Sequence, residues 1–198
     1  MVFKYFLDNS AAWAGLVFEY ESIKKIYLIS GVLGDSIDDL LAGLYNLIEG
    51  KSVTKVTDFL DDNYSIENNM FEWIIDEEGS KVKLVFSVNC NIDKINLKII
   101  ENDFETKKCI FDNEINKNEL IDNILESCNE ILLKYGIIGY FMNFGREFPI
   151  YKYLLLMDNK CKNIVFDDFD EMCPHGQVES MYRTNLEEEI KYLTNEFE

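Results

Sequence analysis

The stretch Lys81-Val-Lys-Leu-Val-Phe-Ser-Val88 decides the fold, because its apolar and polar residues alternate with a period of two. Such alternation is typical of a β-strand that buries one face and leaves the other in water. The segments 71–76 and 94–101 alternate in the same way on either side of it, and the turn 77–80 joins the first of them to it. Successive strands joined by short turns favour an antiparallel meander.

Other segments extend this pattern. Residues 14–20 and 24–30 predict a hairpin around a turn at 21–23, and 53–60 and 106–112 predict further strands. The polar segment 61–69 predicts a loop, because Asp and Asn are depleted in strands.

Two helices stand out by their apolar spacing. Apolar residues recur every three or four positions over 37–48 and again over 120–135, which predicts one buried face for each helix. Asn116, with Glu119 three residues later, resembles a capping box at the start of the second helix. Gly136 predicts its end, residues 137–144 predict a short apolar helix, and Pro149 can open another.

Together these elements predict an α+β fold. We expect one antiparallel sheet of about five to seven strands in hairpin–helix–meander order, with helices packed on one face. A C-terminal helical appendage is expected from the apolar spacing of residues 186–197. The predicted organisation is a single α+β domain over 1–160 and an acidic appendage over 161–198, docked on the same domain.

The chain of 198 residues carries 37 acidic against 19 basic residues, a formal net charge of −18. This charge argues against nucleic acid and against anionic membranes as partners, because both attract Lys and Arg. No apolar run in the sequence is long enough to span a bilayer, and we expect no secretory leader. The five cysteines are widely spaced and odd in number, which indicates reduced thiols and a cytoplasmic location.

The acid is unevenly distributed along the chain. Segment 35–78 has twelve acids against two bases, and segment 166–198 has ten against two. In contrast, the predicted sheet face with Lys81, Lys83, Lys94 and Lys98 is mildly basic. Such polarity can steer a basic protein partner to the acidic side, whereas its simpler role is to keep the protein soluble. The candidate partner-binding residues are Asp35, Asp38, Asp39, Asp61, Asp62, Glu77, Glu78, Asp167, Asp168, Asp170 and Glu171.

The residues that usually carry chemistry are scarce. His175 is the only histidine, and Cys173-Pro174-His175 lacks the further ligands that a metal site needs. Gly31-Val-Leu-Gly34 sits between a predicted strand and a helix but has no phosphate-loop motif, and acids follow it. The sequence therefore predicts no catalytic residue, no cofactor site and no metal site, and the chain is expected not to be an enzyme.

Three stretches together resemble a known family. They are Asp35–Gly50, Phe71–Gly79 with the strand that follows, and the helix ending in Tyr135-Gly136 with Phe148-Pro149 beyond it. They are similar to a family of small uncharacterised bacterial α+β proteins, some of which look like immunity proteins of polymorphic-toxin loci. The resemblance covers about residues 13–156, leaves out the acidic tail and implies no catalytic residue. It implies a toxin as the basic partner.

Three functional hypotheses follow. The first is a cytosolic, non-catalytic binding protein, an immunity protein that neutralises a cognate toxin through an acidic surface. The second is a stand-alone or homodimeric bacterial protein whose charge serves solubility. The third is a carboxylate-dependent enzyme or small-ligand binder, which would require two close acids with raised pKa values.

Overall fold

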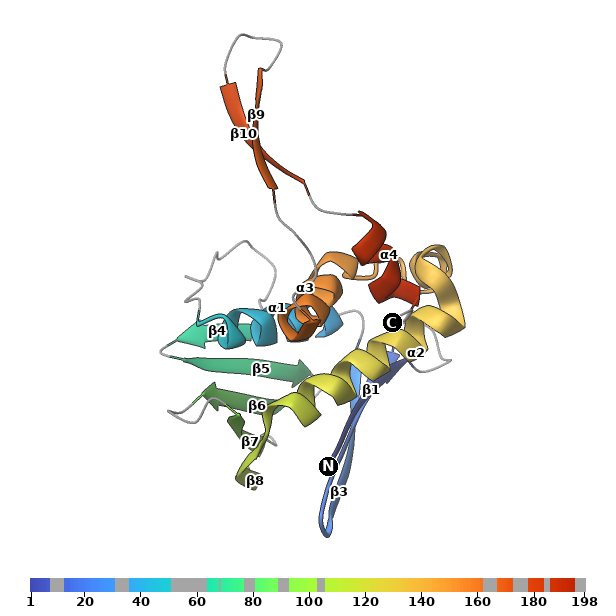
Figure 1. The fold of residues 1–198 in the computed structure, drawn as a ribbon. Coiled ribbons are helices and arrows are strands. Elements are labelled where there is room, and N and C mark those ends of the chain that lie inside the picture. Colours follow the sequence, from blue (N-terminus) through green and yellow to red (C-terminus); the bar gives the residue numbers. More distant parts are fainter. Residues whose placement is uncertain are drawn as a thin grey trace. The chain divides into compact units, whose positions relative to one another are not determined.

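A computed structural model describes residues 1–7, 13–30, 36–50, 64–67, 69–76, 81–88, 93–102, 106–161, 167–172, 178–183 and 186–194. The chain forms two compact units, Met1–Tyr153 and Leu154–Glu198, and the boundary falls inside a helix. Figure 1 shows the elements of both units along the chain.

The first unit is built on two antiparallel sheets, of three and five strands, each with its strands in sequence order. The three-stranded sheet comprises β1 (Val2–Leu7), β2 (Trp13–Tyr20) and β3 (Ile23–Ser30). The five-stranded sheet comprises β4 (Tyr64–Glu67), β5 (Met70–Asp76), β6 (Lys81–Val88), β7 (Lys94–Asn102) and β8 (Lys107–Asn116). Both sheets are therefore meanders.

The helices of this unit follow the predicted spacing. Their bounds are α1 (Ser36–Ile48), α2 (Lys117–Phe144) and α3 (Ile150–Cys161), the last of which crosses into the second unit. Asn116 caps α2 by accepting a hydrogen bond from the Glu119 backbone N–H. Gly136 interrupts α2 with a φ of 66° and a ψ of 173°, so that two helical segments meet at a kink. This confirms the predicted end at Gly136 and the short helix after it.

The two sheets of the first unit pack through their buried faces. Figure 1 shows β1–β3 running across the strands of the five-stranded sheet. Phe3 of β1 meets Phe86 of β6 edge to face, and Phe18 of β2 meets Phe111 of β8 with ring centroids 4.9 Å apart. Such edge-to-face contacts stabilise the core beyond what the burial of the rings alone contributes. Part of the core therefore lies between the two sheets.

The alternating strands bury the faces that their sequence predicts. Trp73 of β5 lies opposite Leu84 of β6, which lies opposite Ile99 of β7, and all three are fully buried. A register shift between Ile99 and Ile100 then breaks the β7–β8 ladder, so that Ile100 pairs with Cys109.

Two helices cover the sheets. The apolar side of α1, including Leu40, Leu41 and Leu44, is fully buried and α1 packs on β4 and β5. The first segment of α2 packs along β1 and buries Leu120, Ile124 and Cys128 among others. Burial of these stripes supplies the main favourable term in folding the unit.

The second unit contains a hairpin and a helix besides the end of α3. The elements are β9 (Asp167–Met172), β10 (Val178–Arg183) and α4 (Leu186–Thr194), and β9 pairs with β10 antiparallel. Tyr192 of α4 is fully buried, and its hydroxyl donates a hydrogen bond of 3.0 Å to the Asp158 carboxylate in α3.

The structure confirms the α+β class, with helices packed on sheet, and corrects several details. The strands divide between two sheets and a separate hairpin rather than forming one sheet. The predicted loop 61–69 is wrong at 64–67, which form β4. The C-terminal appendage, predicted to be helical, contains the β9–β10 hairpin as well as α4. The predicted strand 53–60 lies outside the described residues.

Candidate interaction surfaces

The predicted acidic residues fall into three groups. Asp167, Asp168, Asp170 and Glu171 all lie in β9, where Asp168 is opposite Tyr182 and Asp170 opposite Ser180 of β10. Asp38 and Asp39 lie in the first turn of α1, in the other unit. Asp35, Asp61, Asp62, Glu77 and Glu78 lie outside the described residues. Among the predicted residues that the structure describes, those of β9 are the largest set on one element.

Asp38 has a structural role. Its carboxylate lies 2.5 Å from the Lys152 ammonium at the start of α3, with both side chains about one-third exposed. A carboxylate in the first turn also suits the positive end of the α1 dipole. Asp38 therefore joins two helices, and a partner would have to compete with Lys152 for it.

The expectation of a basic sheet face is wrong, because carboxylates on neighbouring strands neutralise its lysines. Lys83 of β6 lies 2.7 Å from Glu72 of β5, and Lys98 of β7 lies 2.7 Å from Asp112 of β8. The hydrogen bond from Lys98 lowers the pKa of the Asp112 carboxyl, with a second contribution from Asn96. The register places Asp112 directly opposite Lys98 and Glu72 diagonally across from Lys83, which the charge of each segment does not reveal.

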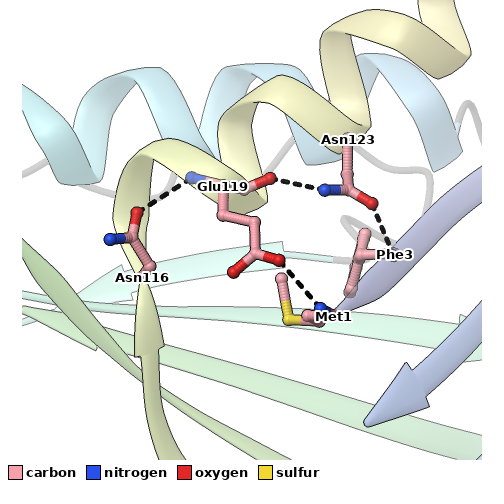
Figure 2. Close-up of polar contacts among 5 residues, drawn as sticks. All are labelled: Met1, Phe3, Asn116, Glu119 and Asn123. Carbon is pink, nitrogen blue, oxygen red and sulfur yellow. Dashed lines mark hydrogen bonds and ion pairs between the residues drawn. The ribbon is translucent and has the colours of Figure 1, made fainter.

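A seam of polar contacts fixes β1 to α2 (Figure 2). The Met1 ammonium lies 2.8 Å from the Glu119 carboxylate, and the Phe3 backbone N–H donates to Asn123 Oδ1. One turn further along α2, Ser127 Oγ accepts from the buried Tyr5 N–H at 3.1 Å. An open strand edge invites pairing with another chain, and here helix side chains cover it.

The seam also changes the predicted capping box. Asn116 makes its half of the motif, whereas the Glu119 carboxylate accepts from Met1. Sequence reasoning missed the seam because it did not assign residues 2–7 to a strand. The polar residues Glu119, Asn123 and Ser127, spaced by four along a helix, were the available signal.

The solvent-facing side of α2 changes character along its length. Its first segment carries Glu119, Asp122, Glu126 and Glu130, which are all exposed. Beyond them come five exposed apolar side chains, which we call the α2 apolar face: Leu133, Ile137, Ile138, Phe141 and Met142. Sequence analysis identified the short apolar helix here, and apolarity of that kind usually indicates burial.

Two buried titratable groups of this unit, Cys128 and Tyr153, have raised pKa values. Cys128 is fully buried in α2, and burial raises the pKa of its thiol. Burial also raises the pKa of the nearby Tyr153 phenol to about 12. A raised thiol pKa disfavours the reactive thiolate, so Cys128 behaves as a small core residue.

The remaining sequence candidates are placed as follows. Trp73 is fully buried, so its large ring serves as an apolar anchor of the core. Cys173-Pro174-His175 and Gly31-Val-Leu-Gly34 lie outside the described residues. Among the side chains that the structure describes, no three His, Cys, Asp or Glu residues gather as metal ligands. None of the described helices is both long and apolar enough to cross a membrane.

Comparison of the chain with protein-family models, with curated proteins and with solved structures found no match. The resemblance to small bacterial immunity proteins therefore stays a prediction from the sequence. Function has to be argued from the surfaces themselves.

Proposed function

We propose that this protein is a non-catalytic binding protein of the cytoplasm that uses acidic surface to engage a basic protein partner. In the form that the sequence resemblance implies, it is an immunity protein and the partner is its cognate toxin. The observation that carries this proposal is the internal pairing of its lysines against a large surplus of acid.

The pairing is widespread in the first unit. Each of the following lysines lies against a carboxylate of the same chain: Lys4, Lys24, Lys25, Lys83, Lys94, Lys98 and Lys152. These pairs do not alter the net charge of −18, but they limit the number of cations that face a partner. A molecule of this kind presents carboxylates outward and attracts cationic proteins over a Debye length of about 8 Å at physiological salt.

The second unit concentrates part of that acid. Residues 166–198 carry ten acids against Arg183 and Lys191, and four of the acids lie in the single strand β9. A dense group of like charges raises the rate of encounter with an oppositely charged protein more than it raises affinity. We therefore expect β9 to contribute to association rate and to its salt dependence.

The test is capture from the native host with a tagged protein, at low salt and at about 0.5 M salt, where the Debye length falls below 5 Å. The expected result is one basic protein, identified by mass spectrometry, that the higher salt releases. Growth rescue of cells expressing that protein would identify it as a toxin. Capture that is indifferent to salt, or that yields no basic protein, would contradict the proposal.

A matched pair of variants separates location from total charge. Asp168→Asn with Asp170→Asn removes two charges from β9, and Asp112→Asn with Glu114→Gln removes two from lysine-paired positions on β8. The first pair is expected to slow association several-fold, and the second to change it less than twofold. Equal effects would show that only total charge matters.

A further inference from the structure

The α2 apolar face is an unusual surface for so acidic a chain. Ile138 is 78% exposed, Leu133 is 77% exposed and Met142 is 75% exposed. Single exposed apolar residues are common, whereas several together mark interaction sites. These five residues occupy only ten positions of one helix.

The face is rigidly built. The second segment of α2 carries four of the five residues. Counted from Ile137, the others follow one, four and five positions later, at Ile138, Phe141 and Met142, so all four lie on one side of the helix. The opposite side of that segment is fixed by Tyr140, which is buried and packs its ring edge to face on Phe148. Because the segment is anchored, it requires little ordering to receive a partner.

Carboxylates precede this face along α2, on the N-terminal side of the kink at Gly136. Glu119, Asp122, Glu126 and Glu130 are spaced by three, four and four, so they follow one side of the first segment, and Leu133 continues the same line three residues later. Met1 and Lys4 pair with Glu119 and Glu130, so a partner would have to compete for these two carboxylates. The complementary surface is one that offers apolar side chains beside Lys and Arg.

We propose that the α2 apolar face and the adjoining carboxylates form the docking site for an amphipathic, cationic segment of the basic partner. This inference rests on the proposed function and adds the place on the protein where the partner binds. A second copy of the chain also has a net charge of −18, so the two copies would repel each other. An anionic membrane would be repelled for the same reason. Charge complementarity thus selects a basic partner over both.

The experiment uses the full chain and two labelled helical peptides of about five turns. Both peptides carry the same leucine stripe. One has lysine at all remaining positions, and the other has glutamate there. Binding is followed by fluorescence anisotropy at low and high salt. The variants are Ile138→Ser with Met142→Ser, and Asp122→Asn with Glu126→Gln. The control is Tyr151→Ser, which removes a 65% exposed apolar side chain from α3.

The lysine peptide is expected to bind at least tenfold more tightly than the glutamate peptide. The serine pair should weaken its binding by about tenfold, as loss of apolar anchors does at interfaces. The amide pair should weaken it several-fold and flatten the salt dependence, and the control should stay within about twofold of the parent.

Other outcomes overturn the inference. If the Ile138→Ser, Met142→Ser variant bound the lysine peptide as tightly as the parent, the α2 apolar face would not be the docking site. If Asp168→Asn with Asp170→Asn then abolished that binding, acid-mediated recognition would survive at a different place. If the lysine peptide bound neither the parent nor any variant at low salt, both this inference and the proposed function would be contradicted. A parent dimer that the serine pair converts to monomer, measured by light scattering, would show that a second copy covers the face.

Discussion

Replacing Gly43 by alanine tests the packing of α1 on the five-stranded sheet. A Cβ atom at this position would lie 2.0 Å from Cε2 and 2.2 Å from Cζ of Phe71 in β5. Phe71 is fully buried and stacks on Phe86, with ring centroids 5.3 Å apart and planes 14° apart. The ring therefore cannot swing aside without disturbing a second core residue.

Two opposing terms set the size of the effect. Overpacking of a core costs about 1–3 kcal/mol, and the upper part of that range applies because ordinary carbon–carbon contact needs about 3.5–4 Å. Alanine in place of glycine inside a helix returns about 1 kcal/mol. We expect Gly43→Ala to lower the free energy of unfolding by about 1–2 kcal/mol.

Urea unfolding followed by tryptophan fluorescence measures this change, since Trp73 is buried in the same core. Gly139→Ala in α2 is the matched control, because its nearest neighbour outside the helix backbone, Tyr135 Cβ, lies 3.9 Å away. The control should gain about 0.5–1 kcal/mol from helix propensity alone. Equal or greater stability of the Gly43 variant than of the parent would refute the packing of α1 described here.

Three further predictions concern the first unit. Ser127→Ala should cost about 1–3 kcal/mol in urea unfolding, because it orphans a buried backbone amide, whereas Asn123→Ala at the half-exposed end should cost less; equal costs would argue against the seam. Alkylation mapped by mass spectrometry should label exposed Cys109 in the native protein and Cys128 only after unfolding. Tyr153, with its pKa raised to about 12, keeps a proton that the unfolded chain releases from about pH 10. Stability should therefore fall between pH 10 and pH 12 by up to roughly 2 kcal/mol, less so in Tyr153→Phe.

The central meander could be predicted from sequence because each strand carries its own signal. In β5 and β6 the buried residues fall on every second position, and this period belongs to no other regular structure. The division of α2 was likewise local, since Gly136 adopts a positive φ that other residues avoid. Where one residue or one period determines the backbone, the sequence is sufficient.

The missed features depend on contacts with a partner strand. β4 and β9 are rich in Ser, Glu and Asp, which have low strand propensity, and each is paired with a strand of the same unit. The charge of the sheet face likewise depends on register, since Lys98 meets Asp112 fourteen residues away. No local pattern contains that information, because the partner strand supplies it.

The second segment of α2 shows that a sequence pattern can identify a helix and still give no correct indication of which side chains are buried. The second segment is apolar on nearly every side, which for an isolated helix indicates full burial. Tyr140 already anchors that segment, and Ile138 and Met142 each keep about three-quarters of their surface in water. Polar side chains at those two positions would cost the fold little, because almost no apolar burial would be lost. Folding of the first unit therefore does not require these side chains to be apolar, whereas a partner that removes them from water would gain about 25 cal/mol for each Å² covered.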